Sequence, residues 1–345
     1  MRNVVKIIGI NLFILIVLLL LLESGARLFI SKNSIKPIFS DQGLRTRNRP
    51  MVEVNRTRGF ALKPGYKSTI YNVNSAGFRG EELPKDIKDR FVILALGEST
   101  TFGWGVKDNQ TYPYYLGEYL REFELAKMTT QRASLVINAG VPSYSSSQTL
   151  EYLKEILNGN SIKPDVILLN ILWNDIWYST IKNWDPQILI SQKPSQWLQF
   201  FTKYSSLVHY ILMGSNDEEL VDIFNPKAMD QYVKNIISMI DISREKGVEI
   251  ILVEPPFDAD HVAESGLNEF QIRYTRAFLI ETGKQYLEQV RRIAKEKNIS
   301  VAKHPLDIRT LHQKSLFLDA LHPSPEGNAI MARDVFNRIS TLYPY

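Results

Sequence analysis

The stretch LALGESTTFGWGV, residues 94–106, leaves an apolar run through Gly97, Glu98 and Ser99 and then carries two more glycines. Because its apolar part shows no alternation with polar residues, it predicts a strand that is buried on both faces. A serine in the turn after such a strand is either a helix cap or a nucleophile. The rest of the sequence decides between these two interpretations.

The same pattern recurs along the chain and predicts the fold class. Short apolar runs occupy residues 91–96, 135–138, 166–172, 248–253 and 299–302. Helical stretches lie between them at 112–127, 147–157, 227–246 and 267–297, and a last helix follows Pro325. Buried strands that alternate with amphipathic helices predict an α/β fold with a flavodoxin-like, doubly wound, five-stranded parallel sheet. Such sheets bind ligands beyond the carboxyl ends of their strands.

The N-terminus predicts a membrane segment. Residues 4–22 are almost wholly apolar, and Arg2 and Lys6 lie at their start. This arrangement predicts a transmembrane signal anchor over residues 1–30, with the N-terminus in the cytoplasm and the remaining chain extracytoplasmic. The alternative is a signal peptide cleaved near the small residues 24–26, which would leave a secreted protein.

The remaining chain divides into a stalk and one large domain. Residues 31–60 are polar and aperiodic and predict a juxtamembrane stalk, and residues 61–345 predict the main domain. The glycines within residues 74–80 predict a turn that needs unusual backbone angles. Residues 176–225 show no strand pattern, so they form either an insertion at the rim of the site or a helical pair that completes the core. This stretch carries the three tryptophans Trp177, Trp184 and Trp197, and also Tyr204.

Composition excludes several classes of function. The net charge of the 345-residue chain is +4 without a basic block, so no nucleic-acid partner is expected. The absence of cysteine excludes disulfides and thiolate sites. The histidines lack the spacing of metal ligands, and the glycines of residues 97–105 lack the lysine of a phosphate loop, so we expect no metal and no cofactor.

Polar residues follow the predicted strands at four places. Ser99 follows the first strand, Gly140 the second and Asn174 the third, while Asp319 and His322 precede the last helix. Because the carboxyl ends of parallel strands share one edge, these groups are expected to meet there. They supply a hydroxyl, a backbone amide, a carboxamide, and a carboxylate three residues before an imidazole.

Acyl transfer requires these chemical types. A serine hydroxyl becomes a good nucleophile when a neighbouring base takes its proton, which predicts Ser99 as nucleophile and His322 as base. Asp319 would orient the imidazole and stabilise its charged form. The N–H groups of Ser99 and Gly140 and the side chain of Asn174 would donate hydrogen bonds to the oxyanion.

In this order the four segments resemble the four blocks of the SGNH (GDSL) hydrolase superfamily. The flanking TFGWGVKDNQTYP, residues 101–113, resembles a membrane-anchored bacterial branch of that family. The resemblance covers residues 60–345 and implies Ser99, Asp319 and His322 as the catalytic triad. It likewise implies Gly140 and Asn174 as oxyanion-hole donors.

Two positions depart from the family pattern. Residues 97–99 are Gly-Glu-Ser where the family has Gly-Asp-Ser, and residues 172–175 are Leu-Trp-Asn-Asp where it has Gly-x-Asn-Asp. The first change adds a methylene beside the nucleophile, and the second removes backbone freedom near a donor. We interpret both as variants of an active enzyme.

The resemblance implies a carboxylic ester hydrolase: an extracytoplasmic serine esterase that cleaves O-acyl, chiefly acetyl, esters on carbohydrate. The alternatives are an O-acyltransferase that modifies a surface polysaccharide and a non-catalytic glycan-binding module on the same fold. The partners expected are an acylated small molecule or glycan and, through the N-terminal helix, a membrane. Trp104 and Trp173 are candidates for stacking on a sugar ring, although each could instead pack its loop against the core.

Overall fold

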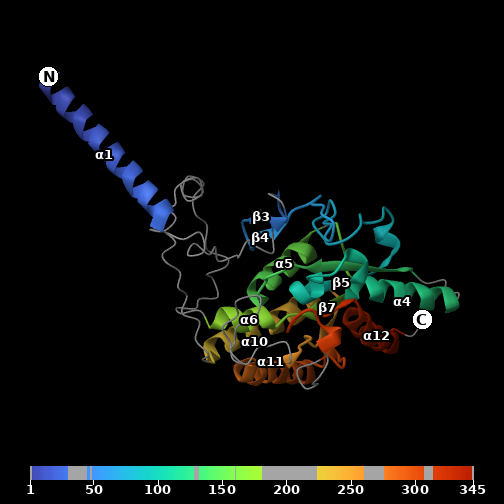
Figure 1. Cartoon of the computed structure of the whole chain (residues 1–345). Helices are drawn as coiled ribbons and strands as arrows, with labels where there is room; N and C mark the ends of the chain where they lie inside the picture. The colour runs from blue at the N-terminus through green and yellow to red at the C-terminus, as the bar shows by residue number, and fades with distance from the viewer. Residues whose placement is uncertain are drawn as a thin grey trace. The chain divides into compact units, whose positions relative to one another are not determined.

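The computed structural model of the chain describes residues 2–29, 45–46, 49–127, 132–159, 161–180, 224–259, 276–306 and 314–343 (Figure 1). The chain forms two compact units. One comprises Met1–Arg49 and Gln192–Glu219, and the other comprises Pro50–Ser191 and Leu220–Tyr345. The predicted site residues all belong to the second unit.

The apolar N-terminal segment forms one continuous helix, α1 (Arg2–Phe29), drawn in blue in Figure 1. Within the described ranges, no helix reaches the length and apolarity that a membrane crossing requires. The predicted transmembrane helix is therefore not confirmed. Two short strands, β1 (Arg45–Thr46) and β2 (Arg49–Pro50), pair with each other.

The second unit is built on one five-stranded sheet in which every pairing is parallel. Its spatial order is β6-β5-β7-β8-β9. The bounds are β5 (Phe91–Gly97), β6 (Ser134–Gly140), β7 (Val166–Asn170), β8 (Glu249–Val253) and β9 (Ser300–Ala302). This is the 2-1-3-4-5 order of a flavodoxin-like sheet, so the predicted sheet is confirmed. In this order the strand after β5 lies on one side of it and the later strands lie on the other side. The ligand crevice is expected at this reversal, between β5 and β7.

Helices cover both faces of the sheet. Their bounds are α3 (Ser99–Phe102), α4 (Tyr112–Lys127), α5 (Ser146–Asn158), α6 (Trp173–Ser179), α10 (Pro226–Glu245), α11 (Arg276–Glu296) and α12 (Pro325–Leu342). Short 3₁₀ turns occur at η1 (Ile87–Asp89), η2 (Asp108–Gln110) and η4 (Lys314–Leu316). α4 and α12 lie side by side (Figure 1), and α10 packs against α5 and α11.

Local sequence explains where two of the helices begin. The side chains of Asn225 and Ser324 each accept a hydrogen bond from the first turn of α10 and α12, and a proline follows each cap. Proline is favoured there because the first N–H groups of a helix have no partner inside it. The start predicted for the long helix at residue 267 lies outside the described residues, which resume at Arg276.

The core lies between β5 and its neighbours on both faces. Ile93 and Ala95 of β5 pack with Leu116 of α4 and Val335 of α12 in one apolar cluster. The alternate residues of β5 point to the opposite face and are equally buried. Burial on both faces explains why the strand is an unbroken apolar run.

Residues 50–90 form a folded segment ahead of the sheet. β3 (Val52–Asn55) and β4 (Gly59–Leu62) pair as an antiparallel hairpin, and Met51 and Phe60 are buried. The predicted stalk is therefore wrong for residues 50–60, because Phe60 packs edge-on against Tyr144 of the main domain. The turn predicted at residues 74–80 is confirmed by φ values of 84° at Gly77 and 109° at Gly80. Of the predicted insertion, residues 181–223 lie outside the described residues.

Two glycines let the helix after β5 lie directly against the strand ends. Gly97 and Gly140 are paired in register at the ends of β5 and β6. A Cβ atom on Gly140 would lie 2.2 Å from the Phe102 nitrogen, and one on Gly97 would lie 2.3 Å from the Asn170 oxygen. Backbone cannot yield as the end of a flexible side chain can, so only glycine fits at Gly140 while α3 keeps its place.

We therefore expect Gly140→Ala to lower the free energy of unfolding by about 1–3 kcal/mol or more, the range typical of overpacked cores. Gly117→Ala, within α4, is the matched control. A Cβ there would make only an ordinary 3.8 Å contact with the side chain of Val136 in β6. This variant should be neutral or stabilise by up to ~1 kcal/mol. Urea unfolding of both variants checks this, and equal stability of the two would contradict the close-contact explanation.

Candidate active site

Ser99 is the first residue of α3, directly after the strand β5 and the buried Glu98. Its side chain is partly exposed, and its Oγ lies 2.8 Å from Nε2 of His322. The N–H of a first helical residue has no partner within the helix, so it is free to meet a negative charge. The structure thus brings the predicted nucleophile and base into direct contact.

His322 is held on its other side by Asp319. The Nδ1 atom lies 2.7 Å from Oδ2 and 2.9 Å from Oδ1 of this carboxylate. Oδ1 also accepts hydrogen bonds from the backbone N–H groups of Leu321 and His322. Burial raises the pKa of Asp319, but the His322 ring and these N–H groups outweigh it and hold the pKa below its usual value. The carboxylate therefore stays ionised and fixes both the orientation and the tautomer of the imidazole.

The Asp319–His322 loop is a closed turn. Leu318 N–H donates to the His322 oxygen at 2.8 Å, and Phe317 and Pro323 form a bridge beyond it. The carboxylate of Asp319 bonds the turn's own amides, so the spacing of three residues brings carboxylate and imidazole together locally. Only the approach of His322 to Ser99 depends on the tertiary fold.

Glu98 connects the nucleophile to the start of α6. Its buried carboxylate accepts the N–H of Trp173 with Oε1 and the N–H of Asn174 with Oε2, both at 3.0 Å. The position where the family has aspartate is therefore occupied by a side chain that bonds both amides at the N-terminus of a helix. Burial raises the pKa of Glu98 to about 8, against the effect of these amides.

The two oxyanion donors predicted besides Ser99 differ in their surroundings. Nδ2 of Asn174 donates to the Tyr144 oxygen at 3.1 Å, and a carboxamide has a second hydrogen to donate. The N–H of Gly140 donates to Oδ1 of Asn138 at 3.0 Å, so in this structure it is not free for an oxyanion. The close approach of α3 explains the glycine at position 140, whereas the role of Asn174 as an oxyanion donor stays a prediction.

The sequence profile of the GDSL-like Lipase/Acylhydrolase family matches residues 93–335, more than half of the chain. The chain belongs to this family. It is a carboxylic ester hydrolase by its family, and the match begins just after the start of β5, so it excludes the segment of residues 50–90.

Solved structures similar to this chain include two GDSL proteins and an acetylxylan esterase. A G-D-S-L lipolytic protein from Desulfitobacterium hafniense DCB-2 shares 16% identity over 72% of this chain and 99% of its own, with a TM-score of 0.43. A GDSL-like lipase from Bacteroides thetaiotaomicron VPI-5482 shares 15% over 76% and 93%, with a TM-score of 0.44. An acetylxylan esterase from Geobacillus stearothermophilus shares 20% over 72% and 93%, with a TM-score of 0.42. No curated protein matches this sequence at a significant level.

α6 itself carries a second acidic side chain of this GDSL hydrolase, the partly buried Asp175. Asp175 accepts the Ser146 N–H at 2.8 Å with Oδ2 and its hydroxyl at 2.5 Å with Oδ1. The Ser146 hydroxyl in turn accepts a hydrogen bond from the side chain of Asn235 on α10. Burial raises the pKa of Asp175 to about 7, and its charge contributes to the raised pKa of Glu98. Asp175, Ser146 and Asn235 thus form a hydrogen-bonded network in a low-dielectric part of the protein.

The two predicted sugar-binding tryptophans lie in different environments. Trp173 is only 5% exposed, stacks on Phe257 at 4.7 Å and donates its indole N–H to the Pro256 oxygen. The interpretation of Trp173 as a sugar platform is therefore wrong, because the ring packs in the core. Trp104 is partly exposed, stacks on Tyr71 at 5.5 Å and follows the nucleophile helix.

Three residues near the nucleophile have no signal in the sequence that would assign them to the site. Tyr71, Arg79 and Asp108 contact the loop after α3 or each other. Arg79 lies in the turn predicted at residues 74–80, but turn composition does not reveal the partner of a side chain. As for metals, no group of three or more potential ligands occurs among the described residues.

The pKa of Asp175 makes stability depend on pH. Because the folded state keeps a proton on Asp175 that the unfolded chain releases above its ordinary pKa of about 3.9, its favourable contribution is present below pH ~4 and lost as pH rises toward about 7. Asp175→Asn should remove this dependence and flatten the fall in unfolding free energy between pH 4.5 and 7 by up to about 1.4 kcal/mol per pH unit. Asp89→Asn, at an exposed residue, is the control. Urea unfolding at several pH values measures the slopes, and the same slope in wild type and Asp175→Asn would overturn the assignment.

Proposed function

We propose that this hydrolase cleaves O-acyl esters by a serine mechanism in which Ser99 is the nucleophile, His322 the general base and Asp319 the orienting carboxylate. One observation carries the proposal: the continuous chain of hydrogen bonds from Ser99 Oγ through the imidazole to the Asp319 carboxylate. A serine beside a base that is itself oriented by a third group is the arrangement that activates a hydroxyl.

The first half of the reaction acylates Ser99. As Oγ attacks the ester carbon, its proton passes to Nε2 of His322, and Asp319 stabilises the imidazolium. The tetrahedral intermediate then collapses, the carbon–oxygen bond to the alcohol breaks, and the alcohol leaves with the proton from Nε2. In the second half, water attacks the acyl-enzyme, gives its proton to His322 and releases the acid and the free Ser99 hydroxyl.

The oxyanion of each intermediate would be held by the backbone N–H of Ser99 and the side chain of Asn174. Glu98 fixes Asn174 by its backbone N–H, and the Tyr144 oxygen takes one of its two side-chain hydrogens. A donor that is already oriented stabilises developing charge without reorganisation at the moment of reaction. The partial positive charge at the N-terminus of α3 acts in the same direction.

We propose acetyl esters of carbohydrate as the substrate class. Trp104 supports this choice, because it is a partly exposed indole at the end of the nucleophile turn, and aromatic faces suit the apolar side of a sugar ring. Transfer of the acyl group to a glycan hydroxyl would use the same acyl-enzyme, so the triad does not distinguish it from hydrolysis.

Purified protein with p-nitrophenyl acetate tests the mechanism. Ser99→Ala should lose nearly all turnover, and Asn174→Ala should lower kcat by ~10²–10³ while the protein stays folded, because one oxyanion donor is removed. Activity that survives in Ser99→Ala would contradict the proposed nucleophile. An inactive wild type that binds glycans would instead favour the non-catalytic module.

The same assay, with acetylated and free glycans added, distinguishes the acceptor. For a hydrolase, free acetate equals p-nitrophenol whatever glycan is present. Acetylated glycan that forms at the expense of acetate, and that disappears in Ser99→Ala, would show an acyltransferase.

We also propose that the hydrolase acts outside the cytoplasm. Arg2 and Lys6 at the start of the apolar α1 support this, since charge ahead of an apolar segment is typical of export. A reporter that is active only in the cytoplasm, fused after Tyr345, should stay silent. A strong signal from this fusion would contradict the proposed location.

A further inference from the structure

The loop that follows the nucleophile helix is held from below by a buried arginine. Arg79 donates from Nη1 to the oxygens of Phe102 and Gly103, the latter at 2.6 Å, and from Nη2 to the Val106 oxygen at 2.6 Å. The side chain is 1% exposed, and its guanidinium lies 4.4 Å from the centre of the Phe102 ring. Three carbonyl oxygens of one loop thus converge on a single cation.

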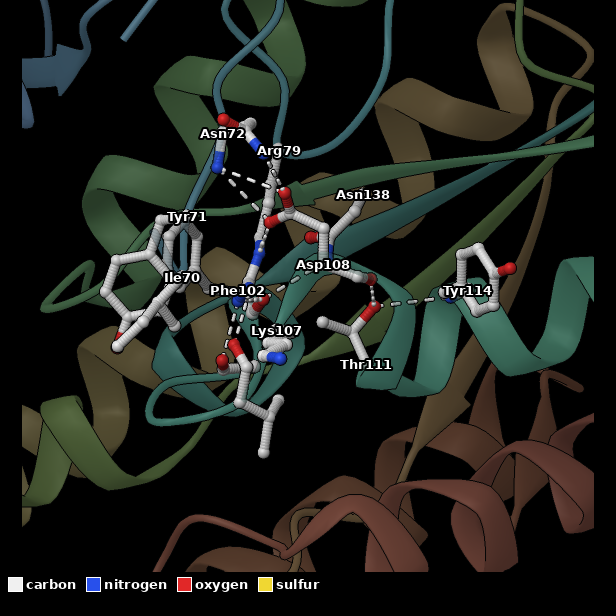
Figure 2. Close-up of polar contacts among 12 residues, drawn as sticks. Ile70, Tyr71, Asn72, Arg79, Phe102, Lys107, Asp108, Thr111, Tyr114 and Asn138 are labelled. Carbon is white, nitrogen blue, oxygen red and sulfur yellow. Dashed lines mark hydrogen bonds and ion pairs between the residues drawn. The ribbon is translucent and has the colours of Figure 1, made fainter. Parts of the chain in front are cut away.

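The Asp108 carboxylate balances the charge of Arg79 and links the guanidinium to Asn72. Its Oδ1 lies 2.9 Å from Nε of Arg79, and its Oδ2 accepts a hydrogen bond from the side chain of Asn72 at 2.6 Å. Figure 2 shows the Arg79 side chain extending from beside Asn72 and Asp108 to the backbone of Phe102. Burial lowers the pKa of Arg79, and the Asp108 charge opposes that effect.

Tyr71, which belongs with Arg79 to the segment of residues 71–79, also contacts this loop. Its hydroxyl accepts the N–H of Gly105 at 2.9 Å, and its ring stacks on Trp104. Gly103 has a φ of 83°, and a Cβ there would lie 2.5 Å from the side chain of Thr111 and 3.1 Å from Nη1 of Arg79. The glycine therefore lets the guanidinium and the loop approach each other.

Two hydrogen bonds connect this loop to the nucleophile. The backbone carbonyl oxygen of Ser99 accepts hydrogen bonds from the N–H of Gly103 at 2.9 Å and the N–H of Trp104 at 3.0 Å. α3 has only four residues, so the rest of the helix cannot fix the position of Ser99. Its geometry depends on what holds the residues just after it.

We propose that Arg79 is a positioning residue for the nucleophile: the segment of residues 71–79, outside the region that the family profile matches, holds the loop of residues 102–106 and thereby sets the distance from Ser99 to His322. This inference rests on the proposed function, because it assumes that Ser99 attacks the substrate. A planar guanidinium can bond three carbonyl oxygens and a carboxylate at once, whereas a lysine ammonium offers three donors from one point.

Arg79→Lys tests the proposal, because it keeps the charge and removes the planar set of donors. With p-nitrophenyl acetate we expect kcat to fall ~10–100-fold and KM to change less than about twofold, since a shift of the nucleophile by about 1 Å affects the reaction more than binding. Labelling of Ser99 by a fluorophosphonate should slow by the same factor.

Arg58→Lys is the matched control. Arg58 is also a buried arginine of residues 50–90, and it pairs with Glu155 at 2.9 Å and lies over the Tyr152 ring, away from the loop of residues 102–106. We expect this variant to lose stability but keep kcat within about twofold. If Arg79→Lys and Arg58→Lys lower kcat equally at equal loss of stability, Arg79 has only a structural role and the proposal is wrong.

Asp108→Asn keeps the test decisive should Arg79→Lys not fold, because it keeps the shape of the side chain and removes the negative charge that pairs with the guanidinium. We expect a several-fold lower kcat at unchanged KM, and an unchanged kcat would overturn the proposal. Ser99→Ala separates the two levels of the account: activity that survives in Ser99→Ala refutes the proposed function, whereas full kcat in Arg79→Lys beside an inactive Ser99→Ala refutes only the positioning role.

Discussion

The arrangement of the site depends on the close backbone contact between α3 and the ends of β5 and β6. A four-residue helix can lie there only because Gly140 leaves space for the backbone of Thr101 and Phe102 and Gly97 leaves space for the Thr101 side chain. This contact places Ser99 at the carboxyl-end edge of the sheet, beside β5 and β7, which are neighbours in the sheet but not consecutive in the chain. From that edge it meets His322, which arrives from the far end of the chain.

Two buried ionisable side chains help to secure this arrangement by forming hydrogen bonds with backbone groups. Glu98 accepts amide hydrogens at the start of α6, and Arg79 donates to carbonyl oxygens after α3. A buried polar group is costly unless its hydrogen bonds are satisfied, and backbone groups cannot move away as side chains can. Such bonds therefore fix loops on either side of Ser99 with a precision that apolar packing alone would not give.

The sheet and the contact between Asp319 and His322 could be predicted from the sequence because their signals are local. Unbroken apolar runs mark the strands, and Asp319 and His322 lie within one turn, so their contact needs no knowledge of the fold. The hairpin of residues 52–62 and the role of Arg79 were beyond prediction, because they depend on contacts between segments without a shared period. The predicted roles of Trp173 and Gly140 differ from the structure for a similar reason. Their sequence neighbours indicate the right loop, but the packing of Trp173 on Phe257 and the hydrogen bond from Gly140 to Asn138 arise only in the folded chain.

If His322 and Asp319 activate Ser99, covalent labelling of this serine depends on both residues. The protein is treated with a fluorophosphonate, digested, and the modified residue is located by mass spectrometry. The account predicts one adduct per chain, on the peptide that contains Ser99, and much slower labelling in His322→Ala. An adduct on another serine, or labelling of Ser99 at the same rate without His322, would contradict it.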